Sequence, residues 1–321
     1  MRRILVTAIS GNIGYGILKA LKSEEYRLFG CDVNEIAAGM DLVSEFWQCR
    51  YAAEKGYIEE LLEKCRKYQI THLIPVNERE IEAVGRERQK FEQMNVKIVI
   101  QTQKVLDICL DKYRTARFLS EHGLDVPQTY TNKSEIRENG YNGTEDSKRN
   151  PQKRYILKPI KSNGSKNITL YNSYSEIPED IGVNCILQEY IESTEEYTVG
   201  VFRQNETINV ISFLRQLKDG YSSQVELTED EQIVRIAEKA AAAFDLEGYF
   251  NLQLRKKDGR YYIFEINPRI SGTVRFRHML GFTDVLWWLD LLDGITVGPW
   301  KNAYKKAVGI RELNEKFLIL E

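Results

Sequence analysis

Short apolar runs and segments of helical periodicity alternate through the first hundred residues. Apolar runs typical of buried strands occupy residues 4–8, 27–31, 72–76 and 96–100. Between these runs, apolar residues recur at helical spacing at 13–21, 57–68 and 81–91. Strands separated by helices imply parallel crossover connections. The pattern therefore predicts an open, doubly wound α/β domain at the start of the chain.

After a helical stretch at residues 105–122, the pattern changes to short strands separated by turns. Strand patterns fall at 155–158, 167–171, 185–190, 197–203 and 207–214, and helical patterns at 229–244 and 284–292. Residues 249–255 and 260–266 form a predicted hairpin around Asp258-Gly259, a strong turn signal. Residues 131–154 are polar and lack periodicity, which predicts a long surface loop. The second half is thus predicted to be α+β with antiparallel strands.

Composition narrows the class of protein. A chain of 321 residues suggests two or three domains. Lys and Arg number 45 against 47 Asp and Glu, without the basic excess of a nucleic-acid-binding protein. The five cysteines form no CxxC pair, which is typical of a reducing compartment, and no apolar stretch approaches the roughly 20 residues of a membrane helix. We expect a soluble, cytoplasmic protein with no nucleic-acid or membrane partner.

The first candidate site is the turn from Thr7 to Gly16, between a predicted strand and a predicted helix. Its glycines would let backbone N–H groups approach a phosphate, and Asp32 ends the next strand, where a dinucleotide enzyme binds a ribose hydroxyl. The spacing resembles the TGxxGxxG turn of short-chain dehydrogenases, but Ala8 replaces the first glycine and no Tyr-x-x-x-Lys follows well downstream. We favour glycines that allow tight strand–helix packing over hydride chemistry.

The second candidate site is Phe264-Glu265-Ile266-Asn267-Pro268-Arg269. Glu265 and Asn267 are two apart on a strand, so both point to one face, and their oxygen atoms suit Mg²⁺. Gln253 shares this face if the hairpin turn is the three-residue loop Lys257-Asp258-Gly259, whereas a two-residue turn would direct it to the other face. A metal site and a solvated polar face fit these residues equally well.

The third candidate site begins at Lys158, which ends a strand, and continues into the small polar loop 160–168. Such a loop can fold over phosphates and donate backbone N–H groups and the Ser165 hydroxyl. It is not a Walker A loop, because no GxxxxGK[ST] sequence occurs. Taken alone, the segment fits a hairpin loop with an exposed lysine more simply.

The order of the motifs is more specific than any one of them. Along the chain stand Leu110-Asp111-Lys112-Tyr113, Lys158-Pro159, Gln188-Glu189-Tyr190-Ile191, Glu196-Tyr197-Thr198-Val199, Gln253 and Glu265-Ile266-Asn267-Pro268-Arg269. Over nearly the whole chain, this order resembles the ATP-grasp superfamily, in particular single-unit relatives of the carbamoyl-phosphate synthase large subunit and carboxylate–amine ligases. The resemblance implies a Rossmann-like pre-ATP-grasp domain at 1–106, then two ATP-grasp subdomains at 107–186 and 187–321 that clasp ATP.

The resemblance also implies which residues bind ATP. They would be Lys112, Lys158, Gly164, Ser165, Gln188, Glu189, Tyr190, Ile191 and Glu196. The two lysines would hold the α- and β-phosphates, and the Gly/Ser loop would close over the β- and γ-phosphates. Backbone groups of the hinge at 188–191 would bind adenine, and Glu196 would bind the ribose hydroxyls.

For the metal and the reaction, the resemblance implies a second set of residues. Gln253, Glu265 and Asn267 would coordinate Mg²⁺ or Mn²⁺, which favours the three-residue hairpin turn. Arg269 would stabilise the transferring phosphoryl group and the acyl phosphate. Arg215 could bind the substrate carboxylate or the γ-phosphate. Arg275 and Arg277 are further carboxylate-binding candidates, and a surface role fits them equally well.

The implied reaction is ATP-dependent phosphorylation of a carboxylate, followed by attack of an amine on the acyl phosphate. Two alternatives stay open: phosphorylation of bicarbonate or carbamate as in carbamoyl-phosphate synthesis, and a non-catalytic ATP-binding module. The partners would be small-molecule carboxylate and amine substrates, with a homodimer as one option for assembly. His72, His122 and His278 are expected to be structural.

Overall fold

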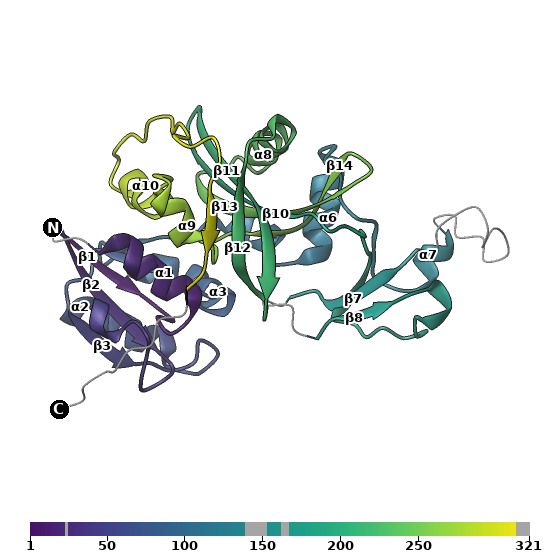
Figure 1. Cartoon of the computed structure of the whole chain (residues 1–321). Helices are drawn as coiled ribbons and strands as arrows, with labels where there is room; N and C mark the ends of the chain where they lie inside the picture. Colours follow the sequence, from purple (N-terminus) through teal and green to yellow (C-terminus); the bar gives the residue numbers. More distant parts are fainter. Residues whose placement is uncertain (23–24, 139–152, 162–166, 313–321) are drawn as a thin grey trace.

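The computed structural model describes residues 1–22, 25–138, 153–161 and 167–312. Its strands form a five-stranded, a six-stranded and a four-stranded sheet. Figure 1 shows the five-stranded sheet at one end of the molecule, the four-stranded sheet at the other and the six-stranded sheet between them. The predicted sequence of an α/β part followed by antiparallel sheets is confirmed.

The five-stranded sheet is parallel throughout, in the order β3-β2-β1-β4-β5. Its elements are β1 (Arg2–Val6), α1 (Asn12–Leu21), β2 (Tyr26–Asp32), a 3-10 turn at Met40–Leu42, β3 (Glu45–Gln48), α2 (Tyr57–Lys67), β4 (His72–Ile74), α3 (Glu78–Arg86), α4 (Arg88–Glu92) and β5 (Lys97–Ile98). This is the predicted doubly wound arrangement. Strand β3 was not predicted, because only Trp47 of its four residues is buried.

The four-stranded sheet is antiparallel, in the order β6-β9-β7-β8. Its elements are β6 (Thr129–Tyr130), α7 (Ser134–Glu138), β7 (Tyr155–Pro159), β8 (Thr169–Tyr171), a 3-10 turn at Tyr174–Glu176 and β9 (Cys185–Glu189). The helix predicted at 105–122 is two helices, α5 (Gln103–Cys109) and α6 (Lys112–Glu121), because the Asp111 side chain caps α6 by accepting from Arg114 N. Helix α7 lies within the stretch predicted to be loop, of which 139–152 fall outside the described residues.

The six-stranded sheet is antiparallel, in the order β14-β13-β10-β11-β12-β15. Its elements are β10 (Glu196–Gln204), β11 (Thr207–Lys218), β12 (Tyr221–Thr228), α8 (Glu231–Phe244), β13 (Gly248–Lys257), β14 (Arg260–Asn267), α9 (Val274–Met279), α10 (Asp284–Leu292) and β15 (Val308–Ile310). Helix α8 packs its apolar stripe on the inner strands of this sheet, in a core with Val199, Val201 and Phe250.

The β13–β14 hairpin corrects one prediction. Its turn has two residues, Asp258 and Gly259, with φ of 50° and 75°, and Lys257 pairs with Arg260. The favoured three-residue turn is therefore wrong. Leu254 nevertheless pairs with Ile263 while Gln253 pairs with Glu265, so Phe264 is an extra residue that forms a β-bulge. The bulge restores the register in which Gln253 and Glu265 stand opposite each other.

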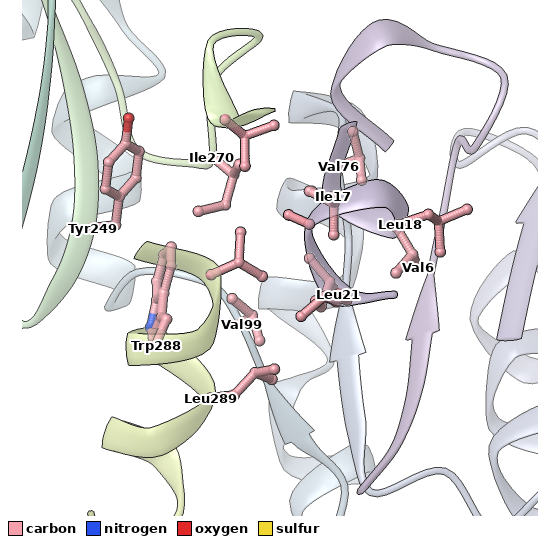
Figure 2. Close-up of a cluster of buried hydrophobic side chains, with 14 of the residues drawn as sticks. Val6, Ile17, Leu18, Leu21, Val76, Val99, Tyr249, Ile270, Trp288 and Leu289 are labelled. Carbon is pink, nitrogen blue, oxygen red and sulfur yellow. The ribbon is translucent and has the colours of Figure 1, made fainter. Parts of the chain in front are cut away.

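A single hydrophobic core joins the first sheet to the six-stranded sheet. Figure 2 shows Ile17 and Leu21 of α1 facing Trp288 and Leu289 of α10 across this core. Two glycines of the 7–16 turn allow close packing, Gly14 within the turn and Gly16 against this core. A Cβ on Gly14 would lie 2.4 Å from the Ala8 carbonyl oxygen, and a Cβ on Gly16 would lie 2.8 Å from Val274 Cγ1. Close packing therefore accounts for both glycines.

Asp32 also has a structural partner in this turn. Its carboxylate accepts from Ser10 N at 2.8 Å and from Asn34 N at 3.0 Å, so it holds the turn to the end of β2. No helix within the described ranges has the length and apolar character required to span a bilayer.

Candidate active site

Most of the predicted nucleotide and metal residues line one pocket between the four-stranded and six-stranded sheets. They are Lys112, Lys158, Gln188, Glu189, Tyr190, Ile191, Glu196, Arg215, Gln253 and Glu265. The strands β7 and β9 supply one wall, and β10, β11, β13 and β14 supply the other. Residues far apart in the chain therefore meet at one site. Gly164 and Ser165 lie outside the described residues.

Lys158 is buried at the end of β7, with 5% of its surface exposed. Its Nζ donates to Gln188 Oε1 at 2.8 Å, and Gln188 Nε2 donates in turn to Thr129 Oγ1 at 2.9 Å. Burial lowers the pKa of Lys158 to about 8, although the negative charge of Glu265 opposes the shift. The simpler interpretation of an exposed lysine on a hairpin loop is wrong.

Glu196 lies between two arginines on the neighbouring strands. Arg215 of β11 donates to its Oε1 at 2.6 and 3.1 Å, and Arg255 of β13 donates to its Oε2 at 2.8 and 3.0 Å. Burial opposes ionisation of Glu196, but the two guanidinium groups outweigh it and hold the pKa of this carboxyl below its ordinary value. Arg255 was not among the predicted site residues.

The predicted metal ligands come from adjoining strands. Gln253 stands opposite Glu265, and Asn251 stands opposite Asn267, so their side chains share one face of the hairpin. Gln253 Oε1 accepts from Arg215 Nη2 at 2.9 Å. The side chains of Gln253, Glu265 and Asn267 offer amide and carboxylate oxygens, which are ligands that Mg²⁺ takes. Magnesium usually completes its coordination shell with phosphate oxygens, and the cations Lys112 and Lys158 line the same pocket. The chemistry of this donor set fits a magnesium ion.

Arg269 follows β14 and reaches the first domain. Its Nη2 lies 3.4 Å from Glu78 Oε1, in the first turn of α3. Burial raises the pKa of Glu78 and nearby Glu265 raises it further, while Arg269 and Lys112 oppose the shift. Among the described atoms, Arg269 Nε is buried and has no acceptor. Glu78 was not among the predicted site residues. Its position shortly after the parallel strand β4 is the sequence feature that could have indicated it.

A small cavity beside the main pocket shows how these groups connect. Glu78, Lys112 and Glu265 line it together, with Gln188 and Phe264. Lys112 begins α6, and its backbone N–H donates to Ile160 O at 3.2 Å, which links α6 to the segment after β7. Residues from all three sheets or their helices thus lie around one space: Glu78 from the first, Gln188 from the four-stranded and Glu265 from the six-stranded sheet.

Arg277 does not take part in this site. Its guanidinium is fully buried and donates to Asp284 Oδ2 at 2.6 Å, Ser271 Oγ at 2.7 Å and Thr273 Oγ1 at 2.6 Å. Both interpretations offered for it, a surface residue and a ligand for a substrate carboxylate, are therefore wrong. Its bonds instead hold the loop between Arg269 and α9. His72 is buried and contacts Asp293, as expected of a structural histidine.

Comparison with known proteins agrees with this geometry. A family model described as an ATP-grasp domain matches residues 109–273, just over half of the chain. The chain belongs to the ATP-grasp family. A second family model, the PylC-like N-terminal domain, matches residues 4–99, which hold the five-stranded sheet of this ATP-grasp protein.

Individual relatives are distant. An uncharacterized protein of Methanocaldococcus jannaschii is 31% identical over 172 residues, which cover 51% of this chain and only 41% of that protein. The N5-carboxyaminoimidazole synthetase of Staphylococcus aureus, solved in complex with ADP, has a TM-score of 0.75 at 15% identity over 97% of this chain and 82% of that one. For the L-amino acid ligase of Bacillus licheniformis, the TM-score is 0.67 at 13% identity, over 91% and 74%. At these identities, the solved structures share the ATP-grasp fold with this chain.

Proposed function

We propose that this ATP-grasp protein is an ATP-dependent ligase that activates a carboxylate as an acyl phosphate for attack by an amine. The observation that supports it best is that Lys158 and the oxygen ligands Gln253 and Glu265 converge in one pocket. Glu78 lines the small cavity beside that pocket, and Arg269 bonds Glu78 from the end of β14. The L-amino acid ligase named above has the same fold, which is consistent with this chemistry.

The proposed roles of the binding residues follow from their places in the pocket. Lys112 and Lys158 neutralise the phosphates, Glu196 accepts the ribose hydroxyls, and the backbone at 188–191 binds adenine. Gln253, Glu265 and Asn267 would hold Mg²⁺, which supplies further charge neutralisation when it is bound. We also propose the domain limits 1–106, 107–186 and 187–321, since the strands of the three sheets follow these limits apart from β9. Two elements of the described residues cross a limit: α5 crosses the first and β9 the second.

The reaction then needs positioning more than covalent help from the protein. A carboxylate oxygen of the substrate attacks the γ-phosphorus, the bond to the β-phosphate oxygen breaks, and ADP leaves. Arg269 stabilises the charge on the transferred group, and Arg215 binds the γ-phosphate or the substrate carboxylate. The amine attacks the acyl carbon, loses a proton and expels phosphate.

A screen of ADP release tests the proposal. Wild-type protein is assayed with Mg·ATP and pairs of amino acids as carboxylate and amine donors, and with bicarbonate. We expect ADP release that requires both a carboxylate and an amine. Glu265→Ala should lower it by on the order of a hundredfold or more, because a charged metal ligand is lost. Glu231→Ala, an exposed glutamate of α8, is the matched control and should keep full activity.

Other outcomes would identify the alternatives. ADP release in the presence of bicarbonate that does not require an amine would support carbamoyl-phosphate-type chemistry instead. Tight Mg·ATP binding without turnover over the whole screen would support a non-catalytic binding module. Unchanged ATP hydrolysis in Glu265→Ala would show that the metal assignment is wrong. Light scattering of the same sample tests whether the protein forms a homodimer.

A further inference from the structure

Arg255 stands in a row of charged residues that crosses three strands. It lies directly opposite Glu196 in the β10–β13 pairing. On the other side of β10, the register that pairs Tyr197 with Leu214 places Glu196 opposite Arg215. Residues opposite each other on antiparallel strands share a face, so the three side chains form one row on the pocket side of the sheet. The sheet register, and not a flexible loop, therefore sets the position of Arg255.

The three guanidinium nitrogens of Arg255 all have acceptors. Nε and Nη2 bond Glu196 Oε2 at 3.0 and 2.8 Å, and Nη1 bonds the Ile191 carbonyl oxygen at 3.2 Å. Ile191 belongs to the segment between β9 and β10, which is the direct connection between the four-stranded and the six-stranded sheets. One side chain thus joins the proposed ribose acceptor to the proposed adenine-binding hinge.

Aromatic contacts hold the guanidinium in this place. Arg255 Cζ lies 4.8 Å from the centre of the Tyr190 ring and 5.5 Å from that of Phe264. Tyr190 is a hinge residue, and Phe264 is the bulge residue beside Glu265. Arg154 adds a second cation at 5.2 Å from the Tyr190 ring. A planar guanidinium can stack on aromatic rings in this way, and a lysine ammonium cannot reproduce this stacking.

We propose that Arg255 is a positioning residue that fixes the carboxylate of Glu196 and the backbone at Ile191 in one geometry for the adenosine part of the nucleotide. Arg255 acts through these two groups, and the phosphates are bound elsewhere in the pocket, by Lys112 and Lys158. It therefore controls nucleotide affinity and leaves phosphoryl transfer itself unchanged. This inference rests on the proposed ATP site, and its test measures binding separately from turnover.

The test compares two ligands by calorimetry, ADP and inorganic tripolyphosphate. Arg255→Met keeps much of the side-chain volume and removes all three donors. The titrations are run at about pH 6.5, where Lys158 carries its proton with or without Arg255. We expect the affinity of the variant for ADP to fall on the order of tenfold to a hundredfold, since hydrogen bonds to charged groups are lost, while tripolyphosphate binding stays unchanged. In turnover assays the KM for ATP should rise by a similar factor, with kcat within about twofold of wild type.

Further variants separate positioning from folding and from charge. Arg255→Lys keeps the charge without the three-way fork and should recover only part of the ADP affinity. Arg203→Met is the matched control: this arginine lies at the far end of β10, where it bonds Asn205 O and Asp245, and its loss should not change ADP binding. In a Glu196→Gln background, Arg255→Met should add little, because the two groups act together.

Each failure has a distinct meaning. Unchanged ADP affinity in a folded Arg255→Met protein, or a fall in kcat with constant KM, would overturn the positioning role and leave the proposed ligase intact. Wild-type protein that does not bind ADP would overturn both proposals. ADP binding that depends on Arg255 in a protein with no turnover would support the positioning role and contradict only the ligase function.

Discussion

At the scale of single residues, Lys158 gives the nucleotide pocket a pH dependence. Because burial lowers its pKa to about 8, against the opposing charge of Glu265, Lys158 loses its proton above pH 8 in the protein alone. A bound polyphosphate favours the charged lysine. ADP binding above pH 8 should therefore take up a proton and weaken by up to about tenfold per pH unit, whereas binding below pH 8 should need no uptake by this group.

Calorimetry in two buffers of different ionisation enthalpy measures this uptake. We expect about one proton per ADP at roughly pH 9 and close to none from Lys158 at roughly pH 6.5. Lys158→Met should abolish the uptake, and Lys90→Met, at an exposed lysine of α4, should retain it. Equal uptake in Lys158→Met and wild type would show that another group is responsible.

The sequence predicted Lys158, Gln253 and Glu265 because their motifs occur in a recognisable order. Two other charged residues of the pocket region escaped prediction for a physical reason. Arg255 stands in a basic run beside the hairpin turn, Arg255-Lys256-Lys257, which is typical of a solvated strand end. Glu78 meets Arg269 across 191 positions. Contacts of this kind depend on strand register and domain packing, which local patterns do not encode.

At the scale of elements, the β13–β14 hairpin shows how two local features set one site. The Asp258-Gly259 turn is the tight turn that its sequence favours, with positive φ at both positions. The bulge at Phe264 then shifts the ladder by one residue, so Gln253 and Glu265 face each other. The turn could be predicted from its dipeptide, but the bulge has no such signal. Strands β12 and β15 were not predicted either. In β15, the first and last residues, Val308 and Ile310, are exposed, so the strand lacks the pattern of a buried strand.

The turn can be tested apart from the site. Gly259 has φ of 75°, and a Cβ added there would meet no atom within 4 Å, so Gly259→Ala costs backbone strain alone, about 1 kcal/mol. We expect a lower urea midpoint with an unchanged KM for ATP. Gly298→Ala is the matched control, because Gly298 has open space without a positive φ. A loss of ATP affinity in Gly259→Ala would show that the turn and the metal face are coupled.

At the scale of the whole molecule, two sets of contacts around α10 join the first sheet to the six-stranded sheet. On one side is the shared core of Figure 2. At the end of α10, the Asp293 carboxylate contacts Arg2 of β1, His72 of β4 and Lys97 of β5. The doubly wound sheet was predictable from its alternating pattern. This attachment was not, because its partners are separated by 196, 221 and 291 positions in the chain.

The interface between α1 and α9 provides the test of this attachment. A Cβ at Gly16 would lie 2.8 Å from Val274 Cγ1, and Val274 is fully buried, so Gly16→Ala should lower the free energy of unfolding by about 1–3 kcal/mol through overpacking. Val274→Ala alone leaves a cavity and also destabilises. In the double variant, the new methyl group enters the space that Val274 vacates, so the combined loss should fall short of the sum by on the order of 1 kcal/mol. Gly16→Ala with Val201→Ala, a buried valine in the separate core under α8, should be additive in the same urea titrations. Additivity in the Val274 pair as well would mean that Gly16 is present for the turn itself and not for the contact between α1 and α9.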